Sequence, residues 1–490
     1  MTLIFLDNDF KYELEAVVKL FFPAELFKLV YGKKPETVIG DYCLFNRVVE
    51  NATATLTVEC SINGKTVCNN KTLKVDSPSY QGDCEVEFGR LLFNILSDLT
   101  GKSVGWGILT GVRPVKRVNK MLLEGRTKKE IFTELKDKYL CSQEKCDIAF
   151  KTAIAQKNIL DTLDDKTFSL YVSIPFCPSR CSYCSFVSQE VEKSLKLIPQ
   201  YVKNLCLEIQ ELGKLVEKIE LKLDTIYFGG GTPTSIDARY INLIMKSIED
   251  SFDVSNLREY TVEAGRADTI TKEKLEVIKN NGATRISINP QTLNNDVLKA
   301  IGRRHTSKDF YDKFHMAREM GFDSINTDLI AGLPTDTIES FKNTINSIID
   351  LSPENITVHT LSIKRTSNLN IENNRDVLKN PVCEMVEYAT KTLLEKGYLP
   401  YYLYKQKNML DNLENIGWAK RGHESLYNIF IMEEKQTILA VGAGGSTKLV
   451  DLKNSKIERV YNYKLPLEYI RRFDIMLERK SEIERFYGFE

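Results

Sequence analysis

Three of the 11 cysteines lie close together in the chain: Cys177, Cys181 and Cys184 are separated by three and by two residues. Clustered thiolates are ligands for zinc or for an iron–sulfur centre. A tetrahedral zinc site normally closes with four protein ligands, and neither a fourth Cys nor a His lies beside these three. Three ligands on a 4Fe-4S cluster leave one iron open to a small molecule that chelates it through nitrogen and oxygen. The spacing therefore favours such a cluster over three cysteines that only pack in a core.

A glycine run and three polar side chains form a second group of candidates. The glycines at 229–231 follow a strand-like run, where the missing side chains let the backbone approach a ligand. A tight turn between a strand and a helix would use glycines too. Glu263, Gln291 and Asp328 each stand at or just beyond the end of a later strand-like run. These positions predict polar groups that point at one binding site.

Six short β-branched runs alternate with amphipathic stretches from residue 170 onward, and these elements must position the candidates. The expected strands are 170–174, 225–228, 260–263, 285–289, 324–329 and 356–361. The expected helices between them are 201–216, 238–249, 274–280, 309–320 and 340–349. This alternation predicts parallel βα units, and six units instead of eight predict an incomplete barrel. Active sites in such folds lie at the carboxyl ends of the strands, and the three cysteines directly follow the first strand.

The predicted fold class is α/β, a partial (β/α)6 barrel with an N-terminal α+β domain and a C-terminal mixed module. The expected domain bounds are 1–160, 165–375 and 376–490. In the C-terminal module a hairpin is expected around residues 427–441, and the tyrosines at 401, 402 and 404 either line a flat ligand site or pack between domains.

The N-terminal domain holds a loop with several glycines at residues 105–113, which leads into a basic stretch. The basic residues are Arg113, Lys116, Arg117 and Lys120. A solvated helix start explains them, and a cradle for an anion is the alternative.

The segments YVSIPFC at 171–177 and FGGGTPT at 228–234 resemble a known superfamily. With the cysteine spacing, they resemble radical S-adenosylmethionine (SAM) enzymes and, among these, the oxygen-independent coproporphyrinogen III oxidase family. The stretches 404–409 and 412–417, together with the N-terminal extension, resemble the longer variant of that family called coproporphyrinogen dehydrogenase. This similarity covers nearly the whole chain.

The resemblance implies one 4Fe-4S cluster on the three cysteines, SAM as the chelating ligand, and a second bound SAM. The glycine run matches the family's site for the aminoacyl end of SAM, and Arg303 matches a position that binds a carboxylate. An arginine suits a carboxylate because two parallel hydrogen bonds orient it. Gln291 and Asp328 match nucleoside-binding positions. All residues that match SAM contacts are Tyr171, Tyr183, Gly230, Gly231, Thr232, Glu263, Gln291, Arg303, Asp328 and the backbone at Ser362.

The function that the resemblance implies is an oxidoreductase of haem biosynthesis. Reductive cleavage of SAM would lead to removal of one hydrogen atom from each of two substrate propionates. Loss of carbon dioxide and an electron from each would turn coproporphyrinogen III into protoporphyrinogen IX. The implied partners are the tetrapyrrole and a low-potential electron donor such as flavodoxin or ferredoxin. No catalytic residue is assigned beyond the cluster ligands.

Two positions depart from the oxidase pattern. Ser173 stands where the oxidases have a His. Phe186 stands where the oxidases carry a further Cys, and in this the chain resembles the related haem chaperones, which lack that Cys. These departures motivate two alternatives: a protein that binds or delivers haem, and a radical SAM enzyme that acts on another tetrapyrrole. The four histidines are expected to be ordinary surface or core residues, with haem ligation by one of them as the alternative.

The composition of the chain limits the kinds of partner that it is expected to bind. Lys plus Arg and Asp plus Glu both number 67, so no net charge attracts nucleic acid or anionic lipid. The chain starts without a basic leader, and its apolar runs are far shorter than the roughly 18 residues of a membrane-spanning helix. An odd number of scattered cysteines argues against a disulfide framework. We therefore expect a cytoplasmic protein without membrane insertion.

Overall fold

The computed structural model describes residues 1–23, 25–33, 35–363, 369, 381–406, 409–454 and 456–489. The chain forms two compact units, Met1–Lys151 with Lys405–Leu413, and Thr152–Tyr404 with Glu414–Glu490. No helix in these described ranges has both the length and the hydrophobicity that a membrane crossing demands. The division into three domains stays a prediction, and its boundary at 375 lies outside the described residues. Positions 407 and 408, in the stretch 404–409 that resembles the family, also lie outside them.

The first unit is built on a five-stranded sheet with the order β2-β1-β3-β4-β5. Its strands are β1 (Thr2–Leu6), β2 (Lys28–Tyr31), β3 (Tyr42–Glu50), β4 (Thr53–Ile62) and β5 (Lys65–Lys74). β1 pairs in parallel with β2 and β3, and the other pairs are antiparallel. In β4 every second residue from Ala54 to Ile62 is buried, because side chains alternate between the two faces of a strand.

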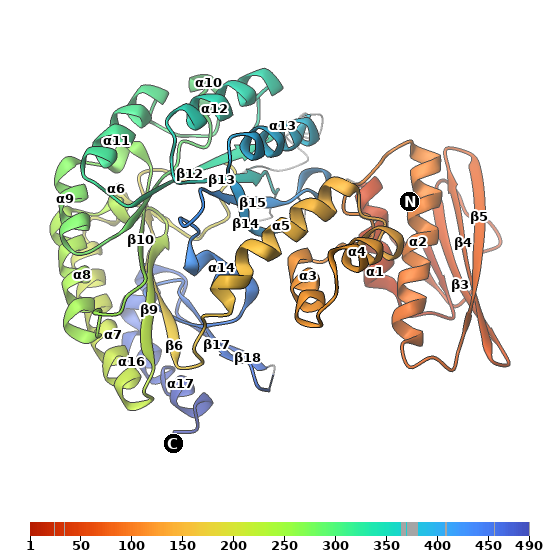
Figure 1. Cartoon of the computed structure of the whole chain (residues 1–490), viewed down its shortest axis with the longest axis horizontal. Helices are drawn as coiled ribbons and strands as arrows, with labels where there is room; N and C mark the ends of the chain where they lie inside the picture. Colours follow the sequence, from red (N-terminus) through yellow and green to blue (C-terminus); the bar gives the residue numbers. More distant parts are fainter. Residues whose placement is uncertain are drawn as a thin grey trace. The chain divides into compact units, whose positions relative to one another are not determined.

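Two helices, α1 (Lys11–Phe21) and α2 (Tyr80–Thr100), pack on this sheet (Figure 1). Leu14 of α1 and Phe88 of α2 join Leu56 and Val58 of β4 in one hydrophobic core. Further along the chain come α3 (Pro114–Leu123), α4 (Lys128–Thr133) and α5 (Gln143–Leu160). Pro114 occupies the first turn of α3, where its missing N–H is not needed.

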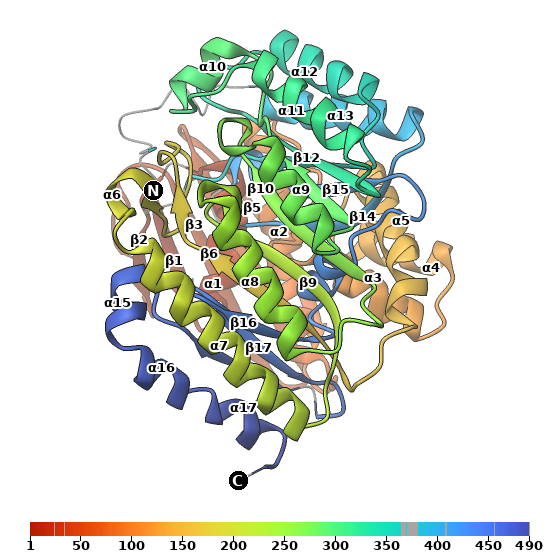
Figure 2. The same cartoon turned by 90° about the vertical axis from the view of Figure 1, so that its left-hand side faces the viewer.

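The second unit contains the six parallel strands that the sequence predicts. They are β6 (Thr167–Ile174), β9 (Lys222–Gly230), β10 (Glu259–Gly265), β11 (Arg285–Ile288), β12 (Ser324–Ala331) and β13 (Asn355–Thr360). The helices between them include α7 (Ile198–Lys218), α8 (Ala238–Ser251), α9 (Lys272–Asn280), α11 (Ser307–Glu319) and α12 (Ile338–Asp350). Figures 1 and 2 show these helices on the outer side of a curved sheet that does not close. The partial barrel is therefore confirmed.

Strands from the last part of the chain extend this sheet at both edges, to a total of 11 strands among the described residues. β14 (Leu399–Tyr404) and β15 (Asn415–Ala419) continue it antiparallel from β13. At the other edge β16 (Thr437–Val441) pairs in parallel with β6, followed by β17 (Ser446–Asp451) and β18 (Lys456–Tyr461). The helices α15 (Pro466–Arg471), α16 (Phe473–Glu478) and α17 (Ser481–Phe486) come last.

The expected hairpin around residues 427–441 is wrong. Helix α14 (Leu426–Glu433) occupies its first half and strand β16 its second. Ser425 caps the helix by accepting a hydrogen bond from the Asn428 N–H, and Glu434 ends it in the left-handed conformation. The apolar run at the start of this segment has no clear period, so pattern alone does not separate a buried helix from a strand.

Candidate functional site

The three clustered cysteines lie in a loop at residues 177–184, the cysteine loop, directly after β6. Cys177 ends a two-residue strand, β7 (Phe176–Cys177), which pairs with β8 (Gln189–Glu190). Cys181 is buried and the other two thiols are partly buried, and none is in a disulfide. A hydrogen bond of 3.1 Å from the Cys184 N–H to the Cys181 carbonyl closes the turn. Burial raises the pKa of the Cys184 thiol, and the other two cysteines raise it further.

The donor set of the cysteine loop fits an iron–sulfur cluster in its chemistry. Three free thiols in one loop are soft ligands, and their mutual repulsion as thiolates is relieved by a bound cation. In the described part of the chain, no three His, Cys, Asp or Glu side chains, these thiols included, stand in the geometry of a metal site. The assignment of Cys177, Cys181 and Cys184 as cluster ligands therefore stays a prediction.

A buried arginine that the sequence analysis did not single out holds the middle of the cysteine loop. Arg266, which is 3% exposed, donates from Nη1 to the carbonyl and the hydroxyl of Ser179 at 3.1 and 2.9 Å. The same nitrogen lies 3.8 Å from Sγ of Cys181, and Asp268 pairs with the other side of the guanidinium at 2.7 Å. His305 lies 3.6 Å from Asp268, and burial lowers its pKa, so a core role is assigned to this histidine.

The glycines at 229–231, the glycine loop, lie against the cysteine loop because β6 and β9 are neighbours. The N–H of Gly231 donates to the Ile174 carbonyl, and the N–H of Thr232 to the Phe176 carbonyl, both at 2.8 Å. A Cβ added at Gly231 would lie 2.5 Å from the Phe176 oxygen and 3.0 Å from Sγ of Cys177. Gly230 has φ of +108°, which favours glycine. Glycine is therefore required here by the close approach of two backbones.

Glu263 lies near the carboxyl end of the next strand, β10, beside a stack of tyrosines. Tyr171 and Tyr227 face each other across β6 and β9, and the ring of Tyr427 lies 4.4 Å from that of Tyr227. The Tyr227 hydroxyl donates to the Glu263 carboxylate. Burial raises the pKa of Glu263 to about 7, the hydrogen bond from Tyr227 opposes this rise, and the charge of Asp328 adds to it.

Arg303 links the cysteine loop to the end of β11. Its Nη2 donates to the Tyr183 hydroxyl at 3.0 Å, and its Nη1 donates to the Asn289 carbonyl at 2.6 Å. Its Nε is buried and has no hydrogen-bond partner among the described residues. A buried guanidinium with a spare donor can bind an anionic group of a ligand.

Gln291, three residues beyond β11, lies beside Asp328 in the last half of β12. The Gln291 N–H donates to the Asp328 carbonyl, and the Ile330 N–H donates to the Gln291 carbonyl, each at 3.0 Å. Gln291 has φ of +69°, which is strained for a residue with a side chain. Burial raises the pKa of Asp328, but the facing His359 and the amide of Asn326 lower it overall, so this carboxyl is ionised at neutral pH.

The structure thus brings most of the predicted residues to the carboxyl ends of β6 and β9 to β12. Ser362 lies partly buried just beyond β13. Tyr401 and Tyr402 are buried in a hydrophobic cluster with Phe430, which favours packing over a ligand site for these rings. No motif in the sequence includes Arg266, Asn289 or Tyr427, so these residues were not predictable from it.

Comparison with known proteins agrees with this geometry. Residues 171–348 match the model of the radical SAM superfamily. An oxygen-independent coproporphyrinogen-III oxidase-like protein, HemZ of Bacillus subtilis, is 42% identical over 79% of this chain and 78% of its own length. The haem chaperone HemW of Lactococcus lactis is 31% identical over 65% of this chain and 80% of its own length.

Among solved structures, coproporphyrinogen III oxidase (HemN) from Escherichia coli superposes with a TM-score of 0.50 at 22% identity. The match covers 66% of this chain and 73% of the oxidase, and it supports the fold. Members of the superfamily bind a 4Fe-4S cluster and SAM, the two cofactors predicted from the sequence. The chain belongs to the radical SAM superfamily and, within it, to the family of coproporphyrinogen III oxidase-like proteins.

Proposed function

We propose that this chain is an oxygen-independent dehydrogenase that converts coproporphyrinogen III to protoporphyrinogen IX in haem biosynthesis. Two propionate side chains each lose carbon dioxide, one hydrogen atom and one electron, which leaves two vinyl groups. The observation that carries the proposal is the close contact of the glycine loop with the cysteine loop through Gly231. This contact supports a shared site for a cluster and for a ligand that binds along exposed backbone. The choice of substrate rests on the similarity to the HemZ protein.

Within this proposal the cysteines and the glycine loop bind the cofactors. Cys177, Cys181 and Cys184 hold the cluster, and the backbone of Gly230 and Gly231 binds the aminoacyl end of SAM. When bound, the cluster and SAM supply the one-electron chemistry that removes a hydrogen atom from the substrate. Thr232, whose hydroxyl donates to Sγ of Cys177 at 3.6 Å, and Arg266, whose Nη1 lies 3.8 Å from Sγ of Cys181, hold these two side chains in place.

The polar residues at the ends of the other strands orient SAM and exclude water. Glu263 accepts hydrogen bonds from SAM, and Gln291 and Asp328 bind its nucleoside part. Arg303 binds a carboxylate, for which its buried Nε is available. Tyr183, which accepts a hydrogen bond from Arg303, aligns that guanidinium with the cysteine loop. The further contacts proposed are those of Tyr171, Thr232 and the backbone at Ser362.

The experiment that tests the function is product analysis under anaerobic conditions. Protein reconstituted with iron and sulfide is incubated with SAM, a low-potential reductant and coproporphyrinogen III, and in parallel with haem. The expected products from coproporphyrinogen III are 5′-deoxyadenosine and a divinyl tetrapyrrole, found by mass spectrometry. Formation of deoxyadenosine without any change in the tetrapyrrole would show that the substrate is another molecule.

A haem chaperone is the second candidate function, and the similarity to the HemW protein favours it. Ser173, at the position of the oxidase His, is fully buried and donates to the Ala443 carbonyl at 2.7 Å. This side chain therefore does not face a ligand. A chaperone would bind haem tightly at one equivalent per chain, visible by absorption, and would leave coproporphyrinogen III unchanged. Decarboxylation without a haem band would exclude this candidate.

A substitution of Gly231 tests the close contact of the two loops. In Gly231→Ala the new Cβ meets the Phe176 oxygen at 2.5 Å, so the cysteine loop must shift. Displacement of reacting groups by about 1 Å costs roughly a hundredfold in rate. We expect SAM cleavage to fall by that order, measured as 5′-deoxyadenosine release. Gly82→Ala, where the new Cβ has nothing within 4 Å, is the control and should keep the wild-type rate.

The raised pKa of Glu263 predicts pH-dependent binding of SAM. Below its pKa of about 7 the carboxyl holds a proton and is a poorer acceptor, so binding weakens as the pH falls. Affinity should rise by up to about tenfold per pH unit below that pKa and level off above it. Calorimetric titration with SAM at several pH values, in the absence of reductant, measures this dependence of the affinity on pH. Glu263→Gln should bind weakly at every pH, whereas the exposed Glu276→Gln should keep the wild-type profile.

A further inference from the structure

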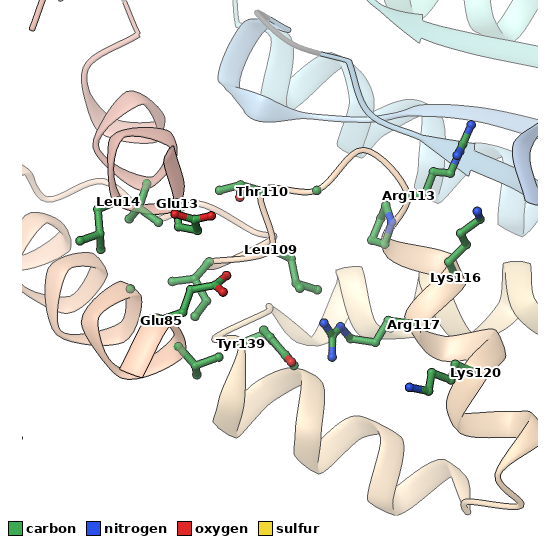
Figure 3. A pocket seen from close by; sticks show the side chains of 16 residues that line it. Glu13, Leu14, Glu85, Leu109, Thr110, Arg113, Lys116, Arg117, Lys120 and Tyr139 are labelled. Carbon is green, nitrogen blue, oxygen red and sulfur yellow. The ribbon is translucent and has the colours of Figure 1, made fainter. Parts of the chain in front are cut away.

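The N-terminal unit contains a cavity of about 470 Å³ that none of the site residues above lines. It lies between α1, α2, the loop at 105–113 and the start of α3 (Figure 3). Its volume is within the range of pockets that hold small organic ligands. All of its lining residues belong to this unit, so the cavity exists independently of the barrel.

One wall of the cavity is basic. Arg113 directly precedes α3, and the helix carries Lys116, Arg117 and Lys120 at the spacing of one face. Val115 and Val118 of the same helix face the core. The guanidinium of Arg117 lies 4.3 Å from the ring centre of Tyr139, which fixes its position at the cavity. The basic residues therefore border an open cavity with an apolar floor, which a helix face that only contacts solvent would not do.

The opposite wall is acidic and the floor is apolar. Figure 3 shows Glu13 and Glu85 on one side and the basic side chains on the other, with Leu109 and Tyr139 between them. Leu14, Val17, Val86 and Ile108 also line the cavity. The lining holds four cationic groups and two carboxylates, and two of the cations also have partners outside it, Arg117 with Glu134 at 3.6 Å and Lys120 with Glu124 at 3.9 Å. Burial raises the pKa of Glu85, and the neighbouring Glu13 raises it further.

The loop that borders the cavity is held in place by its backbone. Gly107 has φ of +53°, and a Cβ there would lie 2.0 Å from the Tyr139 carbonyl, to which the Ile108 N–H donates at 2.9 Å. Lys405 donates from Nζ to the Leu109 carbonyl at 2.8 Å. The cavity wall is therefore formed before any ligand binds, which lowers the entropic cost of binding.

We propose that this cavity binds a carboxylate-bearing tetrapyrrole, with its carboxylates on the basic wall and its apolar body on the floor. The identity of the ligand rests on the proposed function, because the substrate and product of that reaction are tetrapyrroles with carboxylates. Two arginines and two lysines suit several carboxylates on one molecule. Glu13 and Glu85 repel carboxylates and accept hydrogen bonds from N–H donors, so they set the orientation of the ring. The site is additional to the one in the barrel.

Titration of the full-length protein with coproporphyrin III, the stable oxidised analogue, tests the proposal. Fluorescence of the porphyrin gives the number of sites and their affinities. Arg117→Ala/Lys120→Ala should lose one site, or weaken it by at least about tenfold. Both side chains are exposed at the cavity, so the fold is retained. Lys65→Ala/Lys71→Ala, which removes the same charge from exposed positions on β5, should keep the wild-type curve.

The numbers of sites separate this proposal from the proposed function. If both hold, the wild type binds two equivalents and the cavity variant binds one. If the barrel acts on another substrate, the wild type binds one and the variant binds none, and the cavity proposal stands. A variant with the same curve as the wild type overturns the proposal whatever the turnover. The proposal is also overturned if the tetramethyl ester of coproporphyrin III, which has no free carboxylate, binds with unchanged affinity, or if the cavity binds ATP in place of coproporphyrin III.

Discussion

Cys181→Ala is expected to remove the iron–sulfur cluster and, with it, all cleavage of SAM. Cys181 is the buried member of the triad, and two thiolates are too few to hold a cubane that already has an open iron. Iron content after anaerobic reconstitution should fall from about four atoms per chain to near zero. The absorption bands that arise from charge transfer between thiolate and iron should be lost, and the release of 5′-deoxyadenosine should be lost with them.

Cys206→Ala is the matched control for this change. Cys206 lies on α7 in the same unit and is a free, partly buried thiol outside the cysteine loop. It should keep the full iron content and the full rate of SAM cleavage. If Cys181→Ala retained its cluster, or if both variants lost it equally, the cysteine loop would not be the cluster site.

Glu208→Ala is expected to cost the second unit about 3–5 kcal/mol of unfolding free energy. Glu208 on α7 is fully buried and pairs with Lys480 at 2.9 Å. It also accepts hydrogen bonds from the Gly442 N–H, the Asn462 amide and the Tyr469 hydroxyl at 2.6 to 2.8 Å. Its removal leaves a buried ammonium and several donors without their acceptor, which is far more costly than the loss of one hydrogen bond.

Urea unfolding followed by tryptophan emission measures this cost. The chain has two tryptophans, so in a Trp106→Phe background the signal comes from Trp418, which is buried in the second unit. Glu211→Ala on the same helix removes an exposed pair with Lys214 and should cost less than about 1 kcal/mol. Equal costs for the two variants would contradict the role given to the buried carboxylate.

The parts of the site that could be predicted are those with a local signal. The cysteine spacing can be recognised in the sequence without knowledge of the fold. The strands of the barrel were predictable because buried parallel strands are short runs of β-branched residues. Glu263 and Asp328 followed from those strands, since a polar residue at the carboxyl end of a barrel strand faces the site. In the structure Glu263 lies two residues before the end of β10 and Asp328 three residues before the end of β12, and their roles at the site stay predictions.

The remaining features depend on contacts between distant parts of the chain. Arg266 reaches Ser179, and Tyr427 stacks on Tyr227, although no motif joins these residues. The expected hairpin was wrong because the position of α14 is decided by packing on all sides and by its cap at Ser425, and periodicity does not record either.

Strand β6, which leads into the cysteine loop, has β16 as its neighbour on one edge, where Phe168 pairs with Thr437. During synthesis this edge stays unpaired until residues 437–441 have left the ribosome. A free strand edge is a template for pairing with the wrong chain. This edge of β6 is therefore covered only after β16 has been made, and chains that stop before β16 should aggregate instead of accepting a cofactor.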